Sequence, residues 1–192
     1  MKNTLRLGLL FLMVWLQIGE YGFAYNEPDN FAGLKFGQDL TKQMRQCPYV
    51  SLGSGAKSPD GKKIRASGVR CYYQGGDVYA LWNMGELEHQ FDMIDAQQID
   101  GKLEYVYLAF RTNKFPTVFS ILQQRYGKPA QVSRRSLISK QRGSITSKRV
   151  VWKGRNVSIT LDEVDPSDPD WILGTVNYET KAWSSRRGSN TK

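Results

Sequence analysis

The stretch FDMIDAQQIDGKLEYVYLAFR, from Phe91 to Arg111, decides how this chain folds. Two runs with strand character, Phe91–Ile99 and Lys102–Arg111, flank the pair Asp100-Gly101. This pair favours a tight two-residue turn between antiparallel strands. The sequence therefore predicts a β-hairpin over the whole stretch.

The pairing within this hairpin predicts its place in the fold. With a two-residue loop, Met93 faces Leu108 on one side of the hairpin and Ile94 faces Tyr107 on the other. The same register pairs Gln98 with Leu103, Ile99 with Lys102, and Ala96 with Tyr105. Because both faces carry apolar side chains, we expect this hairpin in the middle of a sheet.

The segment after the hairpin has the most regular helical pattern in the chain. Pro116 stands in its first turn, and Gly127 and Pro129 mark its end. The apolar residues that recur at i, i+3, i+4, i+7 and i+11 are Phe115, Val118, Phe119, Leu122 and Tyr126. This spacing predicts an amphipathic helix that packs on the sheet.

A shorter helix is predicted nearer the N-terminus, where Asp39 is a suitable cap and Pro48 a suitable end. Further strands are predicted after the second helix, over Gln131–Ser139, Thr146–Lys153, Val157–Asp162 and Ile172–Ala182. We therefore expect an α+β fold, with an antiparallel β-sheet and two helices packed on one face. Since strands follow each helix, the sequence also suggests two weakly related halves.

The sequence holds two cysteines, Cys47 and Cys71, and one histidine, His89. An even cysteine count predicts a disulfide bond in a chain with an export signal, and residues 1–24 have the pattern of such a signal. This bond would tie the end of the first helix to a strand at Val69–Gln74, across a loop over Ser51–Ser67. Metal binding and thiol catalysis are the alternatives, and the spacing of these residues matches neither.

The first 24 residues have the pattern of a signal peptide. Lys2 and Arg6 precede an apolar run, Leu7–Ile18, and small residues come before Tyr25. A membrane anchor is the alternative, but a span needs about 20 mostly apolar residues, more than this run contains. We expect cleavage of residues 1–24, one domain over 25–183 and a disordered basic tail over 184–192. The product would be periplasmic or secreted and would not span the membrane.

Charge is distributed unevenly along the chain, which carries a formal net charge of +9. No acidic residue occurs between Ala130 and Leu161, while this span holds the bases Arg134, Arg135, Lys140, Arg142, Lys148, Arg149, Lys153 and Arg155. Since side chains alternate along a strand, about half of these bases would share one face. The predicted binding surface consists of Arg134, Arg135, Lys148, Arg149, Lys153, Arg155, Tyr105, Tyr107 and Trp152. The alternatives are a basic surface that serves only solubility and aromatic side chains that pack in the core.

A basic surface attracts anionic partners, which in the bacterial envelope include lipopolysaccharide, phospholipid head groups, acidic glycans and acidic proteins. Nucleic acid fits this charge but not the compartment, and the chain has no recognised nucleic-acid-binding motif. No cofactor is expected. We therefore predict a non-enzymatic binding or inhibitory module, with an immunity-type protein against an envelope-directed toxin as one alternative.

An enzyme is the other alternative. Carboxylates around the hairpin suit a hydrolase of cell-wall glycans, because the two carboxylates of such enzymes have no fixed spacing in sequence. These carboxylates are Glu86, Glu88, Asp92, Asp95 and Glu104. A cleft between Glu86, Glu88 and Glu104 would favour the hydrolase, whereas carboxylates scattered over the surface would favour the binding module.

A second acidic group follows the basic span and consists of Asp162, Glu163, Asp165, Asp168 and Asp170. Its oxygen ligands suit calcium, but it lacks the central glycine and the final glutamate of a helix-loop-helix calcium site. A solvated turn is favoured, and the sequence leaves cation binding open.

Several short motifs together resemble uncharacterised small exported proteins of Gram-negative bacteria. They are Phe31-x-Gly-x-Lys-Phe-Gly37, Cys47-Pro48, Asp100-Gly101-Lys102, Arg125-Tyr-Gly-Lys-Pro129, Trp152-Lys-Gly154 and Val157-Ser-Ile-Thr-Leu161. In outline the chain is also similar to the β-lactamase-inhibitor-like fold and to the folds of small outer-membrane-assembly lipoproteins, although it has no cysteine for a lipid. The resemblance implies a periplasmic or secreted location and implies no catalytic residue.

Overall fold

The computed structural model describes residues 25–51, 57–59, 61–171 and 173–189. The predicted signal peptide lies outside these residues. The large sheet is built from β3 (Arg45–Gln46), β6 (Cys71–Gly75), β7 (Val78–Trp82), β8 (Met93–Ile99), β9 (Lys102–Arg111), β10 (Gln131–Ser139), β11 (Gly143–Trp152), β12 (Val157–Asp162) and β13 (Leu173–Thr180). Two smaller sheets pair β1 (Asn30–Phe31) with β2 (Leu34–Lys35), and β4 (Tyr49–Ser51) with β5 (Lys57–Pro59).

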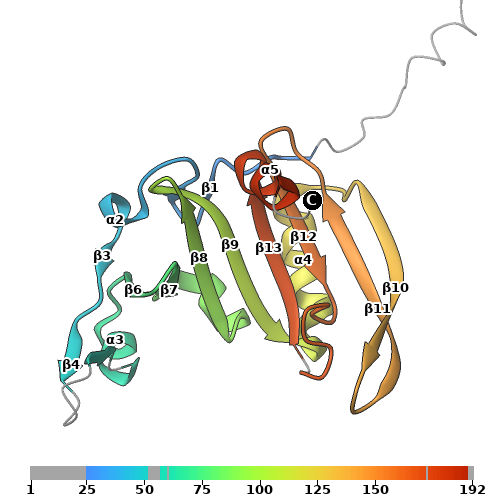
Figure 1. Cartoon of the computed structure of the whole chain (residues 1–192), viewed down its shortest axis with the longest axis horizontal. Helices are drawn as coiled ribbons and strands as arrows, with labels where there is room; N and C mark the ends of the chain where they lie inside the picture. Colours follow the sequence, from blue (N-terminus) through green and yellow to red (C-terminus); the bar gives the residue numbers. More distant parts are fainter. Residues whose placement is uncertain (1–24, 52–56, 60, 172, 190–192) are drawn as a thin grey trace, which may run out of the picture.

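The nine strands of the large sheet lie in the order β10-β11-β12-β13-β9-β8-β7-β6-β3 (Figure 1). Neighbouring strands are antiparallel except for β3 and β6, which run parallel. The α-helices are α2 (Leu40–Gln43), α3 (Gly61–Ser67), α4 (Phe115–Tyr126) and α5 (Lys181–Ser189), with 3₁₀ turns η2 (Gly85–Gln90) and η3 (Thr112–Lys114). The predicted α+β class and antiparallel sheet are confirmed, and the fold is richer in strands than predicted.

Two halves of similar element order make up most of the chain. In each half one helix precedes four antiparallel strands: α3 precedes β6–β9, and α4 precedes β10–β13. The halves meet where β9 pairs with β13 (Figure 1). The first half differs from the prediction, because its helix α3 lies in the segment predicted as a loop. The helix predicted after Asp39 is only the four-residue α2.

Helix α4 covers one face of the sheet and has the predicted bounds. Gly127 ends it at φ +81°, a backbone conformation that glycine adopts without steric cost. Many of the large buried side chains of the main core belong to α4, β9, β11, β12 and β13; they include Val118, Leu122, Val106, Leu108, Phe110, Val176, Tyr178, Trp152, Ile159 and Leu161. We refer to the opposite face of the sheet as the open face.

The predicted hairpin is present, and the two ends of its register differ. Next to the turn, Ile99 pairs with Lys102 and Gln98 pairs with Leu103, as predicted. A bulge follows, because Gln97 pairs with Tyr105 and Glu104 is left as an extra residue.

The bulge shifts every later pair of the hairpin by one residue. Ile94 therefore faces Leu108, and the prediction that it faces Tyr107 was wrong. As a result Leu103 and Leu108 share the core face, while the tyrosines of β9 lie on the open face.

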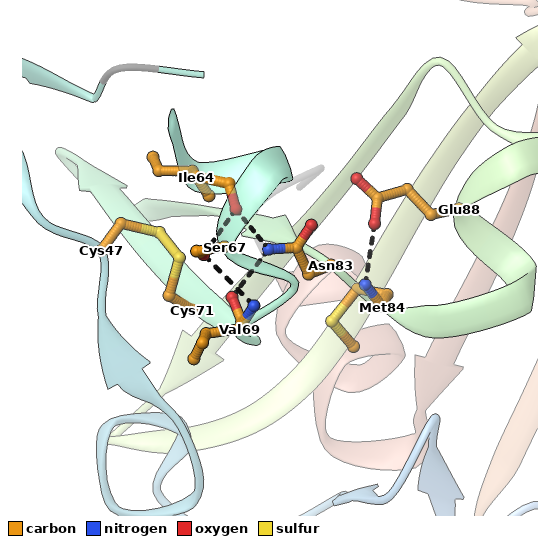
Figure 2. The surroundings of a disulfide bond; sticks show 8 residues. All are labelled: Cys47, Ile64, Ser67, Val69, Cys71, Asn83, Met84 and Glu88. Carbon is orange, nitrogen blue, oxygen red and sulfur yellow. Dashed lines mark hydrogen bonds between the residues drawn. A yellow bond between two sulfur atoms is a disulfide. The ribbon is translucent and has the colours of Figure 1, made fainter. Parts of the chain in front are cut away.

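A second, smaller core surrounds the disulfide bond Cys47–Cys71, and this bond confirms the cysteine prediction (Figure 2). Ile64 of α3 packs with the two cysteines, and the half-buried Trp82 packs against this group. The Asn83 amide donates hydrogen bonds to two backbone carbonyls, those of Ile64 and Val69, each at 2.8 Å (Figure 2). These contacts fasten α3 to the start of β6.

The C-terminal segment also differs from the prediction of a disordered tail after residue 183. Helix α5 continues to Ser189, and residues 190–192 lie outside the described part. The Trp183 ring stacks on Tyr105 with ring centroids 4.6 Å apart. This contact holds the start of α5 against the open face, on the side of the sheet opposite α4 (Figure 1).

Candidate binding surface

The acid-free span of the sequence forms one end of the large sheet. It contains β10, β11 and most of β12, and β10 is the edge strand (Figure 1). We name its eight cations the basic ribbon: Arg134, Arg135, Lys140, Arg142, Lys148, Arg149, Lys153 and Arg155.

The ribbon divides between the two faces of the sheet, as the strand alternation predicts. Arg134 pairs with Lys148 on the α4 side, and Arg135 pairs with Ser147 on the open face. The Lys148 ammonium lies over the ring of Phe119, 5.1 Å from its centroid. This contact is a cation–π interaction, and the Lys148 ammonium forms no ion pair among the described residues, although the Glu163 carboxylate accepts from the Lys148 backbone N–H at 2.9 Å. Arg134 and Lys148 are cross-strand neighbours that both carry a positive charge, so they make this part of the ribbon positive. Because the charges are alike, the two side chains repel each other.

On the open face, one carboxylate holds two arginines. The Asp162 side chain is buried, with Arg135 Nη2 2.9 Å from its Oδ1 and Arg149 Nη1 3.5 Å from its Oδ2. Burial raises the pKa of Asp162, and the charges of Arg149 and Arg135 oppose that increase. With Asp162 ionised, the three groups carry one net positive charge on this face.

Two tyrosines of β9 add further polar groups to the open face. Tyr105 donates to Asn177 Oδ1 at 2.6 Å, and Tyr107 donates to Asp165 Oδ2 at 3.0 Å. Burial raises the pKa of both phenols above their usual range. The two side chains therefore stay neutral at physiological pH and act as hydrogen-bonding groups.

The remaining predicted residues lie elsewhere. Trp152 is fully buried in the main core and donates to the Gly127 carbonyl at 2.8 Å, so its assignment to an accessible surface was wrong. Lys153 and Arg155 are exposed in the turn between β11 and β12. The Arg155 backbone N–H donates to Glu27 at 3.0 Å, which brings one acid to this end of the ribbon.

The acidic segment after β12 is held by contacts within the protein. Asp165 Oδ1 accepts from the Ser167 backbone N–H at 2.8 Å, and Asp170 accepts from the Ser139 hydroxyl at 2.6 Å. Its first member, Asp162, binds the arginines. Across the described residues, the structure gathers no group of three side chains suited to hold a metal ion.

The carboxylates predicted for a hydrolase line two separate pockets. A cleft of about 590 Å³ between β7 and β8, here named the β7–β8 cleft, is lined by Glu88, Asp92 and Asp95 together with Trp82 and His89. Glu104 is buried in another pocket, where the Thr180 hydroxyl donates to it. The Glu86 side chain lies outside the described part. The cleft that would join Glu88 with Glu104 is therefore not formed.

Sequence reasoning missed three residues that organise the open face: Asp162 as the shared acid, Asn177 and Trp183. The sequence places Asp162 only in the acidic group after the basic span, and the strand register is what brings it beside Arg149. Likewise, Trp183 stands at the edge of the predicted tail, and its contact with Tyr105 depends on the tertiary fold.

Comparison with protein-family models, curated proteins and solved structures gives no match for this chain. Among the residues that the structure describes, no helix has the length and apolar character needed to cross a membrane. The candidate site therefore stands on its own geometry.

Proposed function

We propose that this protein is an exported, non-enzymatic binding or inhibitory module of the cell envelope that presents the basic ribbon to an anionic partner. The disulfide bond supports export, because such bonds persist in oxidising compartments. The proposed location is the periplasm or the exterior of the cell.

The observation that carries this proposal is the poor neutralisation of the ribbon. Among the described residues, only Arg135 and Arg149 of the ribbon form ion pairs, and both use Asp162. Arg142 is bound by backbone carbonyls of Pro169 and Asp170. An anionic partner would gain the attraction of ribbon cations that form no ion pair among the described residues.

Retention on immobilised heparin tests the proposal, since this polyanion reports on anionic binding in general. The ribbon variant changes three exposed cations, Arg134→Glu, Lys140→Glu and Lys153→Glu. The control variant makes the same change of net charge at Lys35, Lys102 and Arg111, which are exposed and outside the ribbon. We expect the ribbon variant to elute at clearly lower salt than the control. Equal elution of the two variants would contradict the proposal.

A second candidate function is a carboxylate-dependent hydrolase of cell-wall glycans, centred on the β7–β8 cleft. Burial raises the pKa of Asp95, as a general acid requires, and Trp82 lines the same cleft. Release of reducing ends from peptidoglycan by the purified protein, lost in Asp95→Asn, would support this function. No release above that of Asp95→Asn would exclude it.

A further inference from the structure

The outermost strand of the basic ribbon leaves its backbone open to a partner. β10 pairs with β11 on one side, and no strand lies along its other side in the described chain (Figure 1). It has nine residues and contains no proline. Such an edge presents a row of backbone N–H and C=O groups that can accept another strand.

The side chains of this edge form a mixed strip on the α4 side. Val132 is 53% exposed and Ile138 is 75% exposed. Both are among the few large apolar residues that are exposed in the described part of the chain. Arg134 lies between them in sequence, is exposed and has no ion pair within the described residues. All three have the same parity along β10 and therefore share one face.

From these observations we infer that β10 binds an extended acidic segment of another protein by strand addition, which names the partner class of the proposed function and rests on it. An added strand would place a carboxylate opposite Arg134, where its negative charge would offset the repulsion between Arg134 and its cross-strand neighbour Lys148. Apolar side chains of the segment would cover Val132 and Ile138. A segment that pairs antiparallel with β10 would have the sequence pattern apolar-x-polar-x-acidic-x-apolar.

A second copy of this chain fits the same edge poorly. Full antiparallel pairing of β10 with itself would put Arg135 opposite its own copy and Arg134 two positions from its copy. Like charges at these distances are unfavourable. The two arginines therefore oppose self-association and favour an acidic occupant.

The experiment uses the purified protein and a synthetic peptide with the antiparallel pattern, carrying glutamate at the position opposite Arg134. We expect saturable binding, together with slower hydrogen exchange of the β10 amides that point away from β11, which belong to alternate residues. A peptide of identical charge but with N-methylated backbone at alternate residues tests strand addition, because it cannot complete the ladder. It should lose binding.

A charge exchange tests the contact with Arg134. The Arg134→Glu variant should bind the glutamate peptide about tenfold more weakly, and a lysine peptide should regain that loss. Arg111→Glu is the matched control, since it makes the same charge change at an exposed position outside the ribbon and should leave peptide binding within about twofold.

Three results would overturn the inference: β10 amides unchanged by saturating peptide, equal binding of the N-methylated peptide, or a dimer of the free protein with protected β10 amides. Each is separable from the proposed function. Retention on heparin that depends on the ribbon would still support an anionic partner if strand addition fails.

Discussion

The two halves of the sheet stabilise their helices in different ways. Helix α4 has twelve residues and buries Phe115, Val118, Leu122 and Tyr126 in the main core. Helix α3 has seven residues, and Ile64 is its single buried side chain. The disulfide bond and the Asn83 hydrogen bonds supply what α3 lacks in apolar contact (Figure 2).

The longest and the shortest pairings between neighbouring strands of the two four-strand sets fall in different halves. β10 and β11 are paired over nine residue pairs, whereas β7 and β8 are paired over three. Figure 1 shows the α3 region as a narrow extension of the broad sheet. The comparison indicates that the α4 half is stabilised by packing and the α3 half mainly by covalent and polar ties, and the following experiments test this difference.

Removal of the largest buried side chain of the α4 half should have the largest effect. Trp152→Ala deletes a fully buried indole and its hydrogen bond to Gly127, so we expect a loss of about 3–5 kcal/mol of unfolding free energy. Urea denaturation measures it. Trp171→Ala is the control, because Trp171 is 65% exposed and its loss should cost less than about 0.5 kcal/mol.

Removal of the disulfide bond should act on the other half. Cys47→Ala with Cys71→Ala opens a loop with a sequence separation of 24, which corresponds to about 3.5 kcal/mol in the loop-entropy model. Hydrogen exchange should accelerate more at β6 and α3 than at α4. Equal acceleration at both sites would show that the two halves unfold as one unit and would break the comparison.

The two hydrogen bonds donated by Asn83 should contribute less to the free energy of unfolding than the disulfide bond does. Asn83 has φ +58°, so Asn83→Gly allows the same backbone conformation and removes the two hydrogen bonds of the side chain. We expect a loss of about 1–2 kcal/mol in urea denaturation. Asn83→Ala should cost about 1 kcal/mol more, because alanine also resists this conformation. If Asn83→Gly and Asn83→Ala lose equal stability, then Asn83 contributes through its side-chain hydrogen bonds alone and not through its backbone conformation.

The smallest effect is expected at Asp95, which lines the β7–β8 cleft in the α3 half. Burial raises the pKa of the folded Asp95 above the ordinary value of 3.8, so the folded state binds this proton more tightly than the unfolded state. Stability therefore falls as pH rises from about 4 through the folded pKa.

Asp95→Asn removes this titration. The variant should be more stable than the parent at pH 7, and this advantage should vanish below pH 3.8, as followed by denaturation across pH. Asp92→Asn is the control at an exposed position and should change stability by less than about 0.5 kcal/mol. A parent more stable than Asp95→Asn at pH 7 would contradict the burial argument.

Periodic segments could be predicted closely from the sequence. The bounds of α4, β10 and β12 match the prediction, and α4 and β12 each have a regular apolar pattern with clear end signals. α3 was missed because Lys62, Lys63 and Arg65 surround its one apolar anchor, which leaves no pattern to detect. α5 was missed because its stabilising contact, Trp183 on Tyr105, joins residues far apart in sequence.

The candidate site was predictable only in part. The acid-free span located the basic ribbon, and strand alternation separated Arg134 from Arg135. The burial of Trp152 could not be read from the same pattern, since alternation does not tell which face a helix covers. The pairing of Arg135 and Arg149 with Asp162 needed the register of three strands.

The extra residue at Glu104 has a consequence for how this hairpin can change length. Leu103 and Tyr105 lie on opposite faces although two positions separate them, so the strand would alternate regularly if Glu104 were absent. Deleting it would keep Val106 and Leu108 inside and both tyrosines outside, at the cost of its contact with Thr180. Deleting any single residue between Val106 and Phe110 would instead exchange the inward-facing and outward-facing side chains at one end of the strand. The hairpin thus tolerates shortening at one position and resists it at its neighbours.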